Sequence, residues 1–273
     1  MSNYKLLDCG DKLKLEKFGD YILQRPCPQA LWAKQDPSLW LTPDAEFVRT
    51  DKEKGEWTIH NKKLPKTWQI ISTGGLKWEL ELNQFGNIGV FTEHWIYARD
   101  LPLFFENESK ILNLFSYTGS NCLELVREGF EVTVVDASKS AVSSYIKNLE
   151  INNLSRDGQR LILEDANKFV AREIRRNSQY DGIIMDAPSF GRGTKGEVFN
   201  IEDDLLKLLL SCRELLTKRG KMVYTLHSPR FTPAILENLT KSLFPNKTVK
   251  VEEILNPCKS GITLPSGFLV KIS

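Results

Sequence analysis

Three carboxylates follow short apolar runs of the chain and could bind the polar groups of a nucleotide-like ligand. They are Asp136 after residues 131–135, Asp165 after residues 161–164 and Asp186 after residues 180–185. Short apolar runs predict buried strands, and the carboxyl ends of parallel strands form the edge at which open α/β sheets bind ligands. A carboxylate at that edge can accept hydrogen bonds from ribose hydroxyls or from an amino group.

The segment Asn113-Leu-Phe-Ser-Tyr-Thr-Gly-Ser-Asn121 predicts the turn after the first strand of such a pocket. Gly119 lies where the strand must give way to a helix, and it would permit close approach of the backbone to a ligand. The residues expected to border the ligand are Phe115, Tyr117, Thr118 and Gly119. The turn lacks the G-x-G-x-x-G run that binds a pyrophosphate, which disfavours a dinucleotide and favours S-adenosylmethionine. A plain helix start capped by Ser or Thr is the structural alternative.

The first two carboxylates each allow a second interpretation. Asp136 can accept hydrogen bonds from two vicinal ribose hydroxyls, with Ala137 and Ser138 beside the ligand, or it can cap the helix that follows. Its place at the end of the second strand favours the ribose. Asp165, followed by Ala166, can accept a bond from an adenine amino group, although capping of the next helix explains it nearly as well.

The segment Asp186-Ala-Pro-Ser-Phe190 follows the fourth strand of this series. Here Asp186 could orient an amino group of a flat substrate, Pro188 fixes the backbone, and Phe190 offers a ring face for stacking on a base. An ordinary turn is the alternative, because Asp, Pro and Ser are all common in turns. The place at the ligand-binding edge favours a catalytic site formed by these residues.

From Leu101 onward, the sequence alternates between strand-like and helix-like segments. The last two expected strands are joined through Gly261 and Pro265 without room for a crossover helix, so they should pair antiparallel at a sheet edge. This pattern predicts an α/β fold with a Rossmann-like, seven-stranded class I methyltransferase sheet in residues 99–273. The expected strands are 110–114, 131–135, 160–164, 181–185, 221–226, 249–255 and 267–272, and the expected helices are 119–128, 138–152, 166–177, 201–217 and 231–243.

Residues 1–98 have a different character, with short alternating runs in place of helical periodicity, and they predict a small β-rich N-terminal domain. Residues 67–71 and 76–82 flank Gly74-Gly75, which predicts a hairpin. The tryptophans of this region are expected to be core residues rather than platforms for bases. They are Trp32, Trp40, Trp57, Trp68 and Trp78.

The composition predicts a globular chain and limits its partners. A net charge of +2 argues against strong electrostatic binding of long nucleic acid, but it leaves room for a local basic groove. Five cysteines without a C-x-x-C pair suggest neither a disulfide framework nor a zinc site, so a reducing cytoplasm and no metal are expected. No run is long and apolar enough to predict a membrane span. The basic run Arg172 to Arg176 is expected to be a solvated helix face.

Four segments together resemble the bacterial S-adenosylmethionine-dependent methyltransferases that act on large-subunit ribosomal RNA. The segments are Leu112–Gly119, Val134–Asp136, Asp165–Phe169 and Asp186–Gly191, and the resemblance covers about residues 85–273. Gly89-Val-Phe-Thr-Glu-His94 is similar to a motif that precedes the fold in this family and lies near its cofactor. The resemblance therefore implies that Phe91, Glu93 and His94 are cofactor neighbours.

The chain departs from the family at two places. The family's Asp-Pro-Pro-x-Phe is Asp186-Ala-Pro-Ser-Phe190 here, and Tyr224–Pro229 lacks the nucleophilic cysteine of cytosine-C5 members. The expected activity is therefore methyl transfer from S-adenosylmethionine to a base of RNA, with ribosomal RNA as the substrate implied by the resemblance and without a cysteine nucleophile. A methyltransferase for a protein or a small molecule, and a non-catalytic cofactor-binding protein, are the alternatives.

Overall fold

The computed structural model describes residues 2–51, 54–192 and 198–273, and its contacts divide the chain into two compact units. The first unit comprises Met1–Ile96 and Leu255–Pro265, and the second comprises Tyr97–Ile254 and Ser266–Ser273. The sequence predicts a boundary near residue 98 but does not assign residues 255–265 to the N-terminal part. The division into two domains, residues 1–98 and 99–273, stays a prediction.

Residues 255–265 join the first unit through its apolar core. Cys258 and Leu264 pack in one buried cluster with Leu6 and Cys9. The amide of Lys259 also donates to the carbonyl oxygen of Leu6 at 2.9 Å. These contacts link positions about 250 residues apart, so local sequence patterns do not reveal them.

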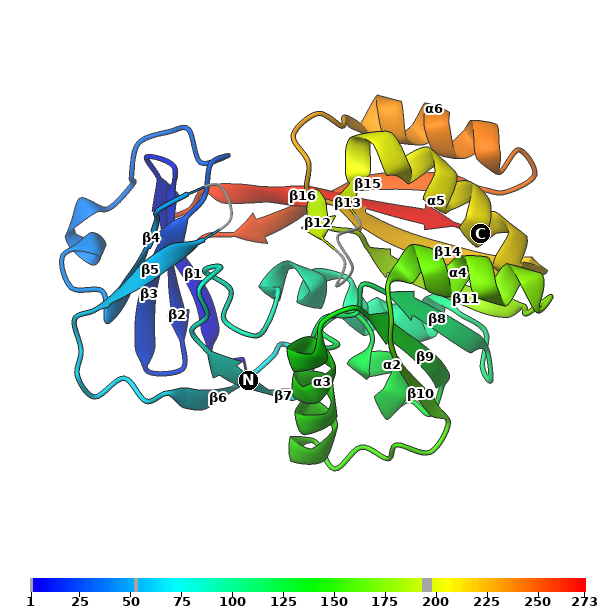
Figure 1. The fold of residues 1–273 in the computed structure, drawn as a ribbon. Helices are drawn as coiled ribbons and strands as arrows, with labels where there is room; N and C mark the ends of the chain where they lie inside the picture. Colours follow the sequence, from blue (N-terminus) through cyan, green and yellow to red (C-terminus); the bar gives the residue numbers. More distant parts are fainter. Residues whose placement is uncertain (1, 52–53, 193–197) are drawn as a thin grey trace. The chain divides into compact units, whose positions relative to one another are not determined.

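The first unit is β-rich, as the sequence predicts. Its five-stranded sheet has the order β1-β2-β3-β4-β5, with β3 and β4 parallel and the other neighbours antiparallel (Figure 1). The predicted hairpin around Gly74-Gly75 is formed by two further antiparallel strands. The elements are β1 (Tyr4–Gly10), β2 (Leu13–Phe18), β3 (Tyr21–Pro26), η1 (Pro37–Trp40), β4 (Ala45–Arg49), β5 (Gly55–Ile59), β6 (Thr67–Ile71), β7 (Lys77–Glu81) and η2 (Thr92–Ile96).

The second unit is built on a seven-stranded sheet of order β10-β9-β8-β11-β14-β16-β15. Neighbours from β10 to β14 are parallel, and β16 runs antiparallel to β14. The prediction of an α/β, Rossmann-like sheet is therefore confirmed. The elements are η3 (Ala98–Asp100), α1 (Leu101–Phe104), β8 (Lys110–Leu114), α2 (Leu123–Arg127), β9 (Glu131–Asp136), α3 (Lys139–Ile151), β10 (Gln159–Leu163), α4 (Ala166–Arg175), β11 (Tyr180–Asp186), β12 (Phe190–Arg192), β13 (Val198–Asn200), α5 (Ile201–Leu215), β14 (Leu216–Leu226), α6 (Pro233–Leu243), β15 (Val249–Pro257) and β16 (Thr263–Ile272).

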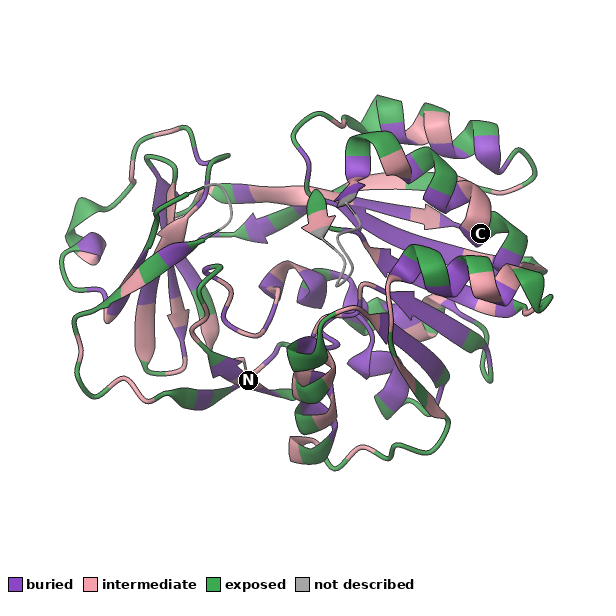
Figure 2. Ribbon diagram, in the orientation of Figure 1, coloured by how far each residue is buried: buried purple, intermediate pink, exposed green. Residues whose placement is uncertain are grey.

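The core of the second unit lies where its helices cover the sheet. Figure 2 shows buried residues along the central strands, and four of the five residues of β8 are buried. The apolar stripe of α5 faces this core, because all of its predicted members are at most 2% exposed. They are Ile201, Leu205, Leu208, Cys212 and Leu215. Apolar residues at spacings of three and four lie on one face of a helix, and in α5 this face packs against the sheet.

The structure adds one ribbon that the sequence does not predict. Strands β12 and β13 pair antiparallel, with Phe190 opposite Asn200. Asn200 then caps α5, since its side chain accepts a hydrogen bond from the amide of Glu202. In the part of the chain that the structure describes, no helix has both the length and the apolar character needed to cross a bilayer.

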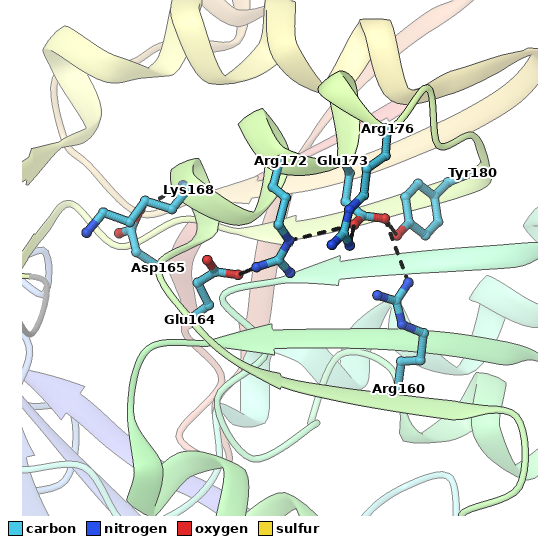
Figure 3. A network of polar contacts seen from close by, with 8 residues as sticks. All are labelled: Arg160, Glu164, Asp165, Lys168, Arg172, Glu173, Arg176 and Tyr180. Carbon is cyan, nitrogen blue, oxygen red and sulfur yellow. Dashed lines mark hydrogen bonds and ion pairs between the residues drawn. The ribbon is translucent and has the colours of Figure 1, made fainter.

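An ion network centred on one buried carboxylate lies on the α4 side of the sheet, and its arginines reach the carboxylate from the solvent side. Glu173, which is 2% exposed, accepts a hydrogen bond from the hydroxyl of Tyr180 at 3.0 Å. Arg176 lies 3.3 Å from Glu173 and Arg160 lies 3.7 Å away (Figure 3). Arg172 pairs with Glu164 at the end of β10. Arg175 and Arg176 are exposed, as the expectation of a solvated face requires, whereas Arg172 is half-buried and is held by Glu164.

Glu173 should make folding stability depend on pH. Burial raises its pKa, but hydrogen bonds from Ser178 and Tyr180 and the nearby arginines outweigh burial, so the pKa lies below the ordinary value. A depressed pKa of an acid stabilises the fold above the unfolded value of about 4.3, and this contribution disappears as the pH falls through the folded value. We expect Glu173→Gln to lower the free energy of unfolding by about 2 kcal/mol at pH 7, because the buried hydroxyl of Tyr180 loses its charged acceptor.

Urea unfolding of the whole chain at several pH values measures this effect. The difference between wild type and Glu173→Gln should shrink as the pH falls below about 4.3. A difference that stays constant over this range would show that the lost stability comes from packing rather than from charge. Glu237→Gln, at an exposed pair with Lys241 on α6, is the matched control and should change stability by less than about 1 kcal/mol.

Candidate cofactor and catalytic site

The registers of the sheet bring the predicted carboxylates to one edge. Leu114 at the end of β8 pairs with Val135 of β9 and with Met185 of β11. Leu163 at the end of β10 pairs with Asp136. Because these strands are parallel and end at the same level, the segments that follow them meet at the carboxyl edge of the sheet. The predicted turn and all three carboxylates lie there.

The turn after β8 has an unusual backbone. Phe115 and Tyr117 adopt positive φ angles of 55° and 50°. Bulky residues rarely take this conformation, which costs about 1–3 kcal/mol and is found mainly at functional sites. Phe115 also packs its ring 5.4 Å from that of Phe199, and the side chain of Thr118 is buried.

Amide side chains hold this turn from behind. Asn113 of β8 and Asn121 at the far end of the turn share a buried hydrogen bond of 2.9 Å. Asn148 of α3 donates to the carbonyl oxygen of Thr118 at 3.1 Å. These contacts offset the strain of the turn and keep its shape fixed before any ligand binds.

Both the backbone conformation and the packing of the turn require a glycine at position 119. Its φ angle is 93°, and a Cβ atom there would lie 2.7 Å from the ring of Tyr145. The sequence assigns this glycine to close approach of a ligand. The structure shows that the turn packs against α3 at this point, which by itself requires a glycine, and contact of Gly119 with the cofactor stays a prediction.

Asp136 links the turn to the end of β9. Its carboxylate accepts hydrogen bonds from the amides of Tyr117 and Ser138, both at 2.8 Å. Ser138 itself caps α3, where it accepts a bond from the amide of Ala141. Burial raises the pKa of Asp136 above its ordinary value, although the two backbone bonds act in the opposite direction. The ionised acid is thus kept in a place that disfavours its charge, which is typical of functional carboxylates.

The end of β10 shows the capping role that the sequence leaves open. The side chain of Asp165 accepts a hydrogen bond from the amide of Lys168 at 3.0 Å and caps α4 (Figure 3). The neighbouring Ala166 is buried. This cap does not involve every oxygen of the carboxylate, so contact with an adenine amino group stays a prediction for Asp165.

Asp186 at the end of β11 is held by the neighbouring strand. Its Oδ1 atom accepts a hydrogen bond from the hydroxyl of Thr225 at 2.5 Å and lies 3.0 Å from Nε2 of His227. Pro188 is exposed, and Phe190 keeps 46% of its surface accessible. An exposed aromatic ring four residues after a fixed carboxylate could stack on a planar base while the acid accepts from its amino group.

His227 is the residue of this edge that the sequence analysis does not propose. It directly follows the predicted strand 221–226. This position at the carboxyl end of a strand is the sequence feature that could have indicated His227 as a site residue. Its partner Asp186 lies 41 residues earlier. Only the parallel pairing of β11 with β14, with Asp186 opposite Thr225, brings the two side chains together.

Phe91, Glu93 and His94 belong to the first unit, in or beside η2. The rings of Phe91 and His94 are 5.4 Å apart, and His94 is buried. Glu93 and Phe91 line a hollow of about 160 Å³ together with Lys14 and Arg25. That these three residues border the cofactor stays a prediction.

The comparisons with known proteins identify the class. Residues 40–267 match the family model of the S-adenosylmethionine-dependent methyltransferases. The chain belongs to this family, and S-adenosylmethionine is its cofactor. A solved S-adenosylmethionine-dependent methyltransferase from Agrobacterium tumefaciens is similar over 99% of this chain and 90% of its own, with a TM-score of 0.90 and 33% identity. A second structure, of the methyltransferase SMU.776 complexed with S-adenosylhomocysteine, shares the fold with a TM-score of 0.79 at 19% identity.

Curated relatives are larger proteins. Ribosomal RNA large subunit methyltransferase K/L of Shewanella oneidensis is 30% identical over 288 residues, which cover 98% of this chain and 38% of the relative. The protein of the same name from Shewanella baltica is 29% identical over 208 residues, or 75% of this chain and 28% of the relative. The chain thus spans well under half the length of these relatives.

The residues at the edge fit this cofactor. Asp136 lies at the end of the second strand, where Rossmann-type sheets carry a ribose-binding acid, and its contact with the ribose stays a prediction. The turn after β8 has no anion-binding glycine run, in keeping with a ligand that lacks phosphate. Among the described residues, the buried hydroxyl oxygen of Ser116 has no hydrogen-bond partner. Buried polar atoms are almost always paired, so an unpaired hydroxyl within this turn is consistent with completion by a ligand.

Proposed function

We propose that the chain methylates a base nitrogen of RNA, with large-subunit ribosomal RNA as the substrate. The observation that carries this proposal is Asp186 with the exposed ring of Phe190 at the sheet edge that also holds Asp136. The names of the two Shewanella relatives support RNA as the substrate class.

The site can act mainly by positioning. Bound S-adenosylmethionine supplies a sulfonium methyl group, whose transfer forms a bond from carbon to nitrogen and leaves the electron pair of the broken bond on sulfur. The positive charge passes from sulfur to the acceptor nitrogen, which then releases one proton to water. No net charge is created in this reaction, so orientation of the acceptor should supply most of the acceleration. We infer that Asp136 and the turn after β8 hold the cofactor, that Phe190 stacks on the base, and that Asp186 orients its amino group.

A covalent cysteine mechanism has no support in the second unit. Its two cysteines are Cys122 and Cys212, both fully buried. Burial raises the pKa of each thiol to about 12. A nucleophilic cysteine must be a thiolate with access to its substrate, so neither residue fits that role. We therefore propose direct transfer to nitrogen.

Transfer of a radiolabelled methyl group tests the substrate. The whole chain is incubated with labelled S-adenosylmethionine and with separated RNA and protein fractions from a strain that lacks the gene. We expect the label in large-subunit ribosomal RNA, and nucleoside mass spectrometry should find it on a base nitrogen. Label in the protein fraction, or in 5-methylcytidine, would contradict the proposal.

A further inference from the structure

The imidazole of His227 lies between two hydrogen-bond acceptors. Its Nδ1 atom is 2.7 Å from the carbonyl oxygen of Ser266, and its Nε2 atom is 3.0 Å from Oδ1 of Asp186. All three residues belong to the second unit. Both distances are short enough for charge-assisted hydrogen bonds.

The carbonyl contact is fixed by the backbone of β16. Leu226 of β14 pairs with Phe268, so the stretch of β16 at Ser266 and Gly267 runs beside His227. Gly267 has a φ angle of 120°, and a Cβ atom there would lie 2.5 Å from the carbonyl oxygen of Leu226 and 2.7 Å from Nδ1 of His227. A glycine is therefore required for the strand to approach the ring this closely. The carbonyl oxygen of Ser266 can therefore move away from the ring of His227 only if β16 itself moves.

Proton counting then determines the charge of the ring. A carbonyl oxygen can only accept, so Nδ1 of His227 must carry a hydrogen. In the neutral ring, Nε2 would then be an acceptor facing a carboxylate, which is also an acceptor. One additional proton between Nε2 and Oδ1 resolves the conflict. The ordinary pKa of His is about 6.5 and that of Asp about 3.9, so this proton resides on the imidazole.

We propose that His227 is a positioning residue, held as an imidazolium that donates to the Ser266 carbonyl and to Asp186. With Thr225 it directs two donors onto Oδ1 and so sets the plane of the carboxylate. The cation also lowers the basicity of Asp186, which then orients an amino group of the base without removing its proton. This role rests on the proposed function, whereas the charge of the ring does not.

Nitrogen NMR of the whole chain with labelled histidine measures the charge directly. The chain has three histidines, and Gln variants of His227 and of exposed His60 assign the signals by their loss. We expect both ring nitrogens of His227 to carry hydrogen at pH 7. A signal from an unprotonated nitrogen of His227 would overturn the proposal, whatever the activity of the chain.

Two isosteric variants separate the two hydrogen bonds. In His227→Gln the amide nitrogen takes the place of Nε2 and can still donate to Asp186, whereas in His227→Asn it takes the place of Nδ1 and can reach only Ser266. We expect His227→Asn to lower kcat for RNA methylation by about 10- to 100-fold and His227→Gln to keep kcat within about tenfold of wild type. Binding of S-adenosylhomocysteine should be unchanged in both, and His60→Gln is the activity control.

The outcomes distinguish this inference from the proposed function. Equal losses in His227→Gln and His227→Asn would overturn the positioning role, because a bond to Asp186 would then make no difference. If the wild-type chain transfers no methyl group to RNA, the proposed function fails, and the NMR result alone decides whether His227 is the cation described here.

Discussion

Replacement of Asp186 by Asn is expected to lower kcat for methyl transfer by about 100- to 1000-fold, the range observed when one preorganised polar group is removed from a catalytic site. The amide oxygen of Asn can still accept the bonds from Thr225 and His227 that Oδ1 accepts now. The amide nitrogen must then occupy the other oxygen position. The N–H of the Asn amide would then face the N–H of the substrate amino group, and two donors cannot form a hydrogen bond. The base is therefore no longer oriented, while the fold is kept.

The measurement separates catalysis from binding. Single-turnover methylation of RNA gives the rate of transfer, and calorimetric titration with S-adenosylhomocysteine gives the cofactor affinity. Asp186 is also predicted to contact the cofactor, so a loss of affinity as large as the loss of rate would assign it to cofactor binding alone. Asp157→Asn, at an exposed residue of the same unit, is the matched control and should leave both quantities unchanged.

The second large effect concerns Asp136. We expect Asp136→Ala to weaken binding of S-adenosylhomocysteine by about 100-fold or more, because two charge-assisted hydrogen bonds to the ribose are worth at least about 3 kcal/mol together. The turn after β8 also loses its bond from Tyr117 to the carboxylate. Calorimetric titration of the whole chain measures the affinity, again with Asp157→Asn as the control.

Asp136→Asn distinguishes ligand binding from support of the turn. Because the pKa of Asp136 is raised above its ordinary value, the ionised acid costs native stability at pH 7, and this cost grows as the pH rises through the folded pKa. The neutral amide of Asn removes that cost, and its oxygen still accepts one hydrogen bond. We expect the free energy of unfolding to change by less than about 1 kcal/mol while ribose binding is still weakened. Unchanged affinity in both variants would remove Asp136 from the cofactor site.

Much of the second unit was predictable because its signals are local. A buried strand needs only a short apolar run, and a helix against a sheet needs apolar residues at spacings of three and four. The strand from Lys110 to Leu114 has the predicted bounds, and the stripe on α5 faces the core. Parallel strands must end at a common edge, so Asp136 and Asp186 could be assigned to one site before any coordinates were known.

Other features could not be predicted from local sequence patterns, because they depend on contacts with residues elsewhere in the chain. Glu173 belongs to a helix turn rich in charged residues, and only Tyr180 and Arg160 from neighbouring strands give this buried carboxylate its partners. The ring of Tyr145 leaves no room for a side chain at Gly119, and the sequence of the turn after β8 does not reveal this contact. In both cases the deciding partner is remote in the chain.

The sequence by itself determined the class of fold, the order of its strands and helices and the carboxylates at the ligand-binding edge, because each of these follows from patterns within a few residues. Only the tertiary structure decided which side chains complete the site. Asp186 and Ser266 lie in β11 and β16, His227 directly follows β14, and their geometry exists only once these three strands are paired in register. A hydrogen-bond network depends on positions accurate to a few tenths of an ångström, and the sheet supplies those positions.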